Sequence, residues 1–149
     1  MKKLLCLSIL CLLLFTGCEK LEGKYVEGVY EAATIDFYGG AGNRATAKVT
    51  IDKNGFIESI YLDTEYTTED GIVTTKKALG YDYGMKNYPN SAGEWFEQVE
   101  KLEQAIVENQ GIDFLTLNEN NKTDAVAGCT MQIDALKSAT SLALEKALK

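Results

Sequence analysis

The segment Ala45-Thr46-Ala47-Lys48-Val49-Thr50-Ile51, which leads through Asp52 into Lys53-Asn54-Gly55, decides the fold class. Apolar side chains alternate with polar ones along the segment, and this period of two is typical of a strand with one buried face. The Asn-Gly pair tolerates the positive φ angles that a tight turn requires. Together the two features predict a β-hairpin, and therefore an antiparallel sheet.

Further strands are predicted on both sides of this turn. Residues 28–37 form the preceding strand, which the glycine-rich residues 39–43 join to the segment quoted above. Residues 56–66 form the following strand, but Glu58 interrupts its apolar face and leaves open which side is buried. The expected sheet is small and antiparallel. It has about three or four strands, and a three-stranded meander is favoured. Residues 67–75 are expected to form a polar turn region.

A central helix is predicted over residues 92–109. Ser91-Ala92-Gly93-Glu94 has the spacing of a capping box, and apolar residues follow at helical intervals at Trp95, Val99, Leu102 and Ile106. Gly111 is expected to close the helix. Residues 112–117 are expected to form a short strand and residues 118–123 a polar loop.

A C-terminal helix is predicted over residues 133–148. Its small and apolar side chains form one narrow face suited to close packing, at Leu136, Ala139, Ala143 and Ala147. Strands in the first half of the chain and helices in the second predict an α+β domain. We expect a small antiparallel sheet that packs with the central helix and the C-terminal helix.

The N-terminus has the pattern of an export signal. Lys2 and Lys3 precede the apolar residues 4–15, a run too short to span a bilayer stably. Thr16-Gly17-Cys18 resembles the end of the lipobox of bacterial lipoproteins, although Phe15 stands where Leu is usual. An uncleaved N-terminal membrane helix is the alternative.

The lipobox resemblance implies a division of the chain into three parts. Residues 1–17 are expected to be a lipoprotein signal peptide, and residues 18–25 the lipidated Cys18 with a tether. Residues 26–149 are then the folded domain. Acyl chains on Cys18 are expected to anchor the protein to the extracytoplasmic face of the cell membrane without a transmembrane helix.

The amino-acid composition argues against several classes of function. Without Lys2 and Lys3 the chain keeps 13 basic against 22 acidic residues, a net charge of −9 that disfavours binding to nucleic acid. The chain has no His, which argues against hydrolytic catalysis and against a zinc site. Removal of the signal and acylation of Cys18 leave Cys129 as the single thiol, so the domain is expected to fold without a disulfide.

Asp124-Ala125-Val126-Ala127-Gly128-Cys129-Thr130 is the segment that bears most on function. A helix is predicted directly after it, which puts the Thr130 hydroxyl beside unpaired backbone N–H groups that favour a phosphate. Gly128 allows a sharp turn and the close approach of a ligand. The alternative is that Thr130 is only the N-cap of that helix.

This segment resembles the attachment motif of the FMN-binding domain family, in which a Thr or Ser hydroxyl is esterified to the phosphate of FMN. Asp124, Gly128 and Thr130 match the motif. Ala127 stands where the motif prefers Ser or Thr, Cys129 where it prefers Ala, and a second hydroxyl residue is common where this chain has Gln132.

The resemblance covers most of the mature chain. It is closest to small lipoproteins that serve extracellular electron transfer in Gram-positive bacteria, through Tyr83-Gly84-Met85-Lys86 and Glu94-Trp95-Phe96-Glu97-Gln98. It implies FMN as the cofactor, bound through Asp124, Ala127, Gly128, Cys129 and Thr130. Asp124 is expected to orient the loop by Asx-type hydrogen bonds.

The resemblance also implies partners and an activity. A separate flavin transferase moves FMN from FAD onto Thr130, and a membrane dehydrogenase or quinone pathway supplies electrons. The chain is then an electron carrier and not an enzyme, because the flavin performs the redox chemistry. Flat or polarisable side chains are candidates to line the flavin ring, namely Tyr81, Tyr83, Met85, Tyr88 and Trp95.

Other interpretations stay open at this point. The same fold could serve a ligand-binding or sensor lipoprotein with loosely bound flavin or none, which Ala127, Cys129 and Gln132 favour. Cys129 is either a redox thiol or a small buried residue. The second alternative is favoured, because no partner Cys or His is available to lower the pKa of the thiol. A solute-capturing lipoprotein for a transporter is disfavoured, because two-lobed receptors need roughly twice this length.

Overall fold

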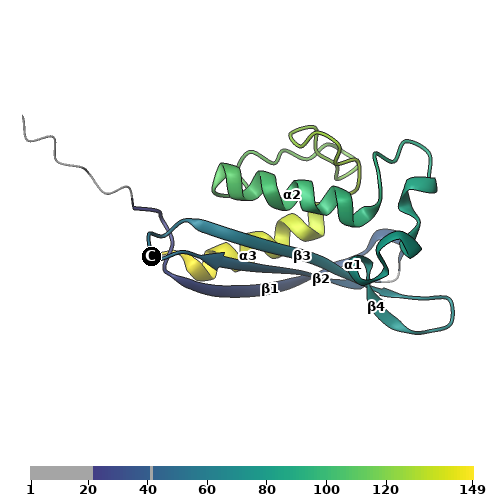
Figure 1. Ribbon diagram of the computed structural model, residues 1–149, viewed down its shortest axis with the longest axis horizontal. Coiled ribbons are helices and arrows are strands. Elements are labelled where there is room, and N and C mark those ends of the chain that lie inside the picture. Colours follow the sequence, from purple (N-terminus) through teal and green to yellow (C-terminus); the bar gives the residue numbers. More distant parts are fainter. Residues whose placement is uncertain (1–21, 41) are drawn as a thin grey trace, which may run out of the picture.

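The structure is a computed structural model that describes residues 22–40 and 42–149. Within these residues the fold is α+β, with one four-stranded antiparallel sheet packed against helices (Figure 1). The strands follow one another across the sheet in chain order: β1 (Gly28–Asp36), β2 (Asn43–Ile51), β3 (Ile57–Thr67) and β4 (Val73–Thr75). The helices are the short α1 (Lys76–Leu79), α2 (Trp95–Asn109) and α3 (Asp134–Ala147). The predicted fold class is confirmed.

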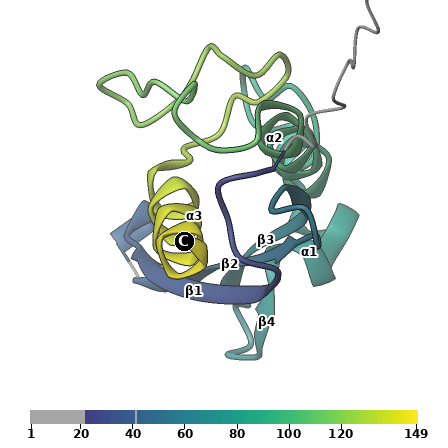
Figure 2. The ribbon, with the colours of Figure 1, turned by 90° about the vertical axis from the view of Figure 1, so that its left-hand side faces the viewer.

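Both long helices pack on the same face of the sheet (Figure 2). α3 lies against β1 and β2, and α2 lies against β3. The face of β2 that points to the helices consists of Ala45, Ala47, Val49 and Ile51, each at most 2% exposed. The alternation in the sequence therefore predicted the buried side of this strand correctly.

Asp52 and Gly55 build the turn between β2 and β3. The Gly55 N–H donates to the Asp52 carbonyl at 3.0 Å, and the Asp52 carboxylate accepts from the N–H groups of Asn54 at 2.8 Å and Phe56 at 2.9 Å. Of the Asn-Gly pair only Gly55 has a positive φ, 85°. The predicted hairpin is confirmed, and Asp52 stabilises it in addition.

A bulge explains why the buried face of β3 is ambiguous around Glu58. The partner of Ile51 is Ile57, whereas the partner of Thr50 is Ser59, so β3 has one extra residue at this point. Glu58 and Ser59 are therefore exposed one after the other, while Ile57 is buried. Strict alternation fails here because the bulge shifts the strand by one residue.

α2 covers the edge of β3 along the first part of the strand, before β3 pairs with β4 at Glu65–Thr67. Gln110, the C-cap residue of α2, accepts from the Ile57 N–H at 2.7 Å and donates to the Ile57 carbonyl at 3.0 Å. Glu103 accepts from the Leu62 N–H at 2.5 Å. Side chains of a helix thus take the place of a neighbouring strand and block further pairing along this edge.

Two predictions about strands were incomplete or wrong. Residues 112–117 form no strand, because the edge of β3 is already bonded to α2. Leu115 from that segment is instead 1% exposed, and its carbonyl accepts from Lys137 of α3 at 2.6 Å. Conversely, β4 lies at the end of the polar turn region 67–75, where no strand was predicted.

α2 begins at Trp95 and not at residue 92. Glu94 and Glu97, instead of Ser91 and Glu94, make the capping box: the Glu97 carboxylate accepts from the Glu94 N–H at 2.8 Å, and the Glu94 side chain accepts in return from the Glu97 backbone. The Ser91 hydroxyl lies outside the helix and donates to the Gly93 carbonyl at 2.7 Å. The apolar face predicted for this helix is buried, at Trp95, Val99, Leu102 and Ile106.

The two ends of the described chain meet beside α3, whose predicted small-residue face is buried. Tyr25 is 3% exposed and forms an isolated antiparallel bridge with Leu148. The Val26 N–H donates to the Ala147 carbonyl at 2.7 Å. The packed part of the chain therefore begins before residue 26, where the domain was expected to start.

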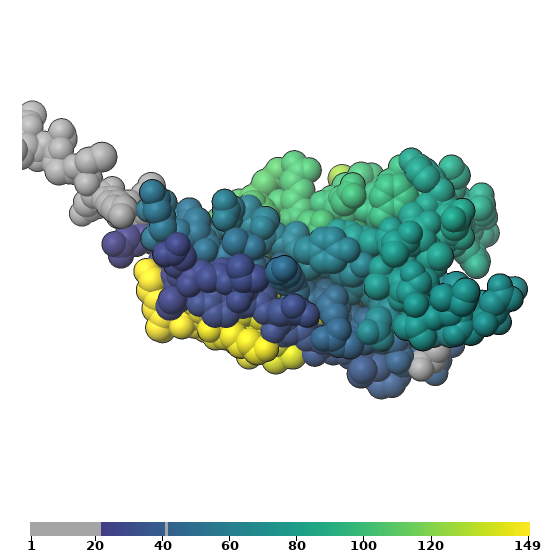
Figure 3. Space-filling view, turned by 60° about the horizontal axis from the view of Figure 1, so that its bottom comes forward, coloured from purple at the N-terminus to yellow at the C-terminus, as the bar shows by residue number. Residues whose placement is uncertain are grey.

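Within the described residues, the outer face of the sheet has no helix over it. Figure 3 shows the first strands (purple and blue) at the surface, with α3 (yellow) along one margin. Apolar side chains such as Val29, Ile35 and Tyr61 are about half exposed on these strands. A sheet with helices on only one face explains why its strands alternate between apolar and polar residues.

The predicted signal peptide and Cys18 lie outside the described residues. Among the helices of residues 22–40 and 42–149, none combines the length and the hydropathy that crossing a bilayer requires.

Candidate functional site

A pocket of about 710 Å³ lies at the end of the sheet next to α1 and the start of α2. Its walls come from the ends of β1 and β3, the start of β2, and loops around residues 80–91 and 120–132. Its volume lies within the range of about 300–1,000 Å³ that is typical of small-molecule sites. The fold thus gathers residues from both halves of the chain around one hollow.

Thr130 lines this pocket. Its Oγ1 accepts from the Ala92 N–H at 3.2 Å and donates to Gln98 Oε1 at 3.1 Å, and its N–H donates to the same Gln98 oxygen at 2.8 Å. α3 begins only at Asp134, with Ile133 as its N-cap. Thr130 is therefore not a helix N-cap, and the hydroxyl is held by hydrogen bonds to α2 and the loop before it instead of lying at the mouth of α3.

Gln98 fixes this geometry from the core. Its side chain is 0% exposed, and its amide nitrogen donates to Ser91 Oγ at 3.1 Å and to the Gly93 carbonyl at 2.9 Å. A buried polar group left unpaired costs about 1–3 kcal/mol, so the amide holds Thr130 firmly against residues 91–93. Gln98 was not predicted as a site residue, although its position three residues after Trp95 puts it on the buried face of α2.

Gly128 and Cys129 are shaped by packing. Gly128 has a φ of 76°, and a Cβ there would lie 2.7 Å from Lys101 Nζ. The sharp turn predicted at Gly128 is present, but the close neighbour is a lysine of α2. Cys129 is 4% exposed, and burial raises the pKa of its thiol, which favours the small buried residue over a redox thiol.

Asp124 and Ala127 are exposed and do not line the pocket. The loop is oriented there by Thr123, whose Oγ1 accepts from the Ala125 N–H at 3.2 Å. Within the part of the chain that the structure describes, the Asp124 carboxylate makes no hydrogen bond, so the geometry lends no support to its expected Asx-type role. Of the five motif residues, the pocket takes in only Thr130.

Most of the side chains predicted to contact a flavin ring line the pocket, namely Tyr83, Met85, Tyr88 and Trp95. Tyr81 does not, since it is 66% exposed and packs edge-on against Phe96 with ring centroids 5.1 Å apart. Tyr66, which was not predicted, also lines the pocket and packs edge-on against Tyr83 at 5.3 Å. Aromatic surface therefore forms a large part of the wall.

Lys76 brings a buried positive charge to this wall. The residue is 5% exposed, its Nζ lies 3.4 Å from Asp36 Oδ2, and it lies 5.5 to 5.9 Å from the ring centroids of Tyr38, Tyr83 and Trp95. Desolvation lowers the pKa of Lys76, and the carboxylates of Asp36 and, more weakly, Asp63 oppose this effect. Lys76 was not predicted as a site residue, because a single lysine has no distinguishing pattern until the fold buries it.

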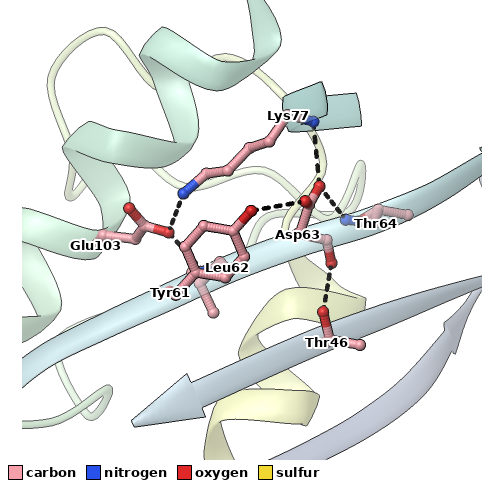
Figure 4. A network of polar contacts seen from close by, with 7 residues as sticks. All are labelled: Thr46, Tyr61, Leu62, Asp63, Thr64, Lys77 and Glu103. Atoms are coloured by element: carbon pink, nitrogen blue, oxygen red, sulfur yellow. Dashed lines mark hydrogen bonds and ion pairs between the residues drawn. The ribbon is translucent and has the colours of Figure 1, made fainter. Parts of the chain in front are cut away.

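The next residue, Lys77, belongs to a separate polar network (Figure 4). Its Nζ lies 2.6 Å from Glu103 Oε1 and 4.0 Å from the ring centroid of Tyr61. Its backbone N–H donates to the buried Asp63 at 3.1 Å, and Tyr61 donates to the same carboxylate at 3.0 Å. The network joins β3, α1 and α2 outside the pocket.

No protein-family model, curated protein or solved structure matches the chain. The likeness to FMN-binding domains therefore rests on the residues quoted from the sequence. Thr130, the aromatic wall and Lys76 come together at the pocket.

Proposed function

We propose that the protein is a membrane-anchored, extracytoplasmic flavoprotein that carries FMN, bound covalently through Thr130, and relays electrons. The observation that supports this most is that Thr130 lines the same pocket as Tyr83, Met85, Tyr88 and Trp95. Both expectations follow from the resemblance, with Thr130 as the attachment site and the other residues as surfaces for a flat ring. The membrane anchor rests on the sequence pattern that ends at Cys18.

The residues of the pocket suit FMN. Its volume is that of a site for a ligand of this class, and its aromatic side chains offer surface for a planar ring system. Burial raises the pKa of Tyr83 to about 12, so its hydroxyl keeps its proton at neutral pH and can donate a hydrogen bond. When bound, the flavin supplies the electron-transfer chemistry.

The hydrogen bonds around Thr130 are compatible with an ester at Oγ1. Esterification removes the hydroxyl proton and with it the bond to Gln98, but the Thr130 N–H still donates to Gln98. The Ala92 N–H still has Oγ1 or a neighbouring phosphate oxygen as its acceptor. The phosphoryl group comes from FAD, and AMP leaves, in the reaction of a separate flavin transferase.

An electron carrier needs no acid or base group tuned for substrate turnover. Tyr83 stays protonated at neutral pH, and the Lys76 ammonium is tied to Asp36. We therefore propose that the chain exchanges electrons with a membrane dehydrogenase or quinone pathway and turns over no substrate of its own.

Intact-mass measurement of the chain coexpressed with a flavin transferase tests the attachment. We expect the wild type to gain one FMN less one water, and Thr130→Val to gain nothing. Thr130→Ser should keep the modification, and Thr116→Val, at an exposed threonine outside the pocket, should be modified like the wild type. A modified Thr130→Val variant contradicts the assignment of this residue.

A ligand-binding or sensor lipoprotein that holds flavin without a covalent bond is the second candidate. It is favoured by the engagement of the Thr130 hydroxyl in two hydrogen bonds, and by Ala127, Cys129 and Gln132, which depart from the attachment motif. An unmodified wild type that quenches the fluorescence of added FMN at a stoichiometry of one supports this candidate over covalent attachment.

A further inference from the structure

We propose that the Lys76 ammonium binds the electron-rich carbonyl end of the flavin ring and stabilises the reduced, anionic form. This inference rests on the proposed function, because it assigns a role toward the ring that Thr130 would tether. It concerns a residue outside the attachment motif.

The surroundings of Lys76 leave the ammonium with unused hydrogen-bonding capacity. An ammonium has three N–H donors. Among the described residues its hydrogen-bond partner is Asp36 Oδ2 at 3.4 Å, longer than the roughly 2.7–2.9 Å typical of a hydrogen bond between charged groups. The other close neighbours are the rings of Tyr38, Tyr83 and Trp95, which attract a cation but accept no strong hydrogen bond.

A buried charge that is not fully solvated or paired lowers the stability of the folded protein. Desolvation lowers the pKa of Lys76 even though Asp36 and Asp63 favour the charged form. A carbonyl-rich ring in the pocket supplies acceptors for the N–H groups that Asp36 leaves free. The same wall carries the ammonium and the aromatic surfaces, so one planar, polar ligand can contact both.

The redox consequence follows from charge balance. Two electrons from a reduced donor and one proton from solvent convert the neutral oxidised ring into a reduced ring with one negative charge. A fixed ammonium beside that ring stabilises the reduced state more than the oxidised state, because the attraction between opposite charges is strong where water is excluded. Lys76 therefore raises the reduction potential of the bound flavin.

The test uses the full chain in detergent, loaded with FMN by coexpression with a flavin transferase and titrated spectroelectrochemically. In Lys76→Met we expect the ratio of reduced to oxidised flavin at a given potential to fall about tenfold. For a two-electron couple this corresponds to a decrease in the reduction potential of about 30 mV. Lys48→Met removes the same charge from an exposed position on β2 and should leave the potential unchanged. Circular dichroism checks that each variant is folded.

Asp36→Asn provides a second measurement of opposite sign. It removes the carboxylate that offsets the ammonium, so the potential should rise in this variant. A potential that is the same in Lys76→Met and Lys48→Met, or that falls in Asp36→Asn, overturns the role of Lys76. If Lys76→Met does not fold, Lys76→Gln and Lys48→Gln, which make the same change of charge, are titrated in their place.

The experiments distinguish a failure of the proposed function from a failure of the role assigned to Lys76. A wild type that gains no FMN mass and binds no added FMN overturns the proposed function and this inference with it. A loaded wild type whose potential does not depend on Lys76 overturns the inference alone.

Discussion

Lys76 and Lys77 are neighbours in the sequence, yet their ammonium groups lie in two different environments. Both belong to α1, and consecutive residues on a helix point about 100° apart. Lys77 meets Glu103 at 2.6 Å in a network of well-matched polar groups (Figure 4). Lys76 meets Asp36 at 3.4 Å and otherwise aromatic rings.

The comparison shows that one lysine stabilises the fold, whereas the other has an ammonium group that is available to bind a ligand. The Lys77 network holds α1 and α2 to β3, since Glu103 also accepts from the backbone of Leu62. Removal of one member of a tight buried pair leaves the other uncompensated. The weaker pairing of Lys76 contributes less to stability and leaves hydrogen-bonding capacity that a ligand can use.

The largest effect is expected when Glu103 is replaced. Glu103→Ala leaves the Lys77 ammonium unpaired and removes the acceptor of the Leu62 N–H, so the free energy of unfolding should fall by about 3 kcal/mol. Urea denaturation measures this change. Glu100→Ala, at an exposed position of the same helix, should change stability by less than about 0.5 kcal/mol. Equal losses in the two variants contradict a structural role for the network.

A smaller effect is expected at the pocket. Asp36→Asn leaves the buried Lys76 without its carboxylate and should lower the free energy of unfolding by about 2 kcal/mol. The double variant Asp36→Asn and Lys76→Met removes both charges and should regain most of that loss. The same denaturation curves give the coupling energy of the pair. A double variant less stable than Asp36→Asn alone contradicts the idea that Lys76 is a charge kept at a cost.

The smallest effect concerns pH. Because burial lowers the pKa of Lys76 below its ordinary value of 10.5, the unfolded chain binds more protons between the lowered pKa and 10.5. The free energy of unfolding should therefore rise with pH through that window, relative to the Lys76→Met variant. Urea denaturation of both proteins at a series of pH values from neutral up to 10.5 measures the difference. A difference that falls as the pH rises contradicts the direction of the pKa shift.

Much of the fold was predictable because its signals are local. The alternation along β2 and the helical spacing in α2 and α3 identified the buried faces correctly. The predictions failed where a distant segment intervenes, as at residues 112–117, whose possible partner edge on β3 is covered by α2. The capping box was misplaced for another reason, because Ser91 and Glu94 have the same spacing as Glu94 and Glu97.

The candidate site was predictable only in part. Thr130 and four of the five proposed ring contacts line the pocket, whereas Asp124, Ala127 and Tyr81 lie outside it. Gln98, Asp36 and Tyr66 were missed, and of these only Gln98 had a signal in the helical pattern. No pattern within a short window relates Asp36 to Lys76, since their contact is made across the fold.

The sequence by itself determined the three long strands and the two long helices, the buried faces of β2, α2 and α3, the turn at Gly55 and a hydroxyl at Thr130. Each of these depends on residues within a few positions of one another. Only the tertiary structure decided which lysine is buried against the pocket and which belongs to a structural network. Burial and charge pairing depend on side chains brought together from distant segments. The properties of Lys76 therefore arise from Asp36, Tyr83 and Trp95, and not from the residues beside it in the chain.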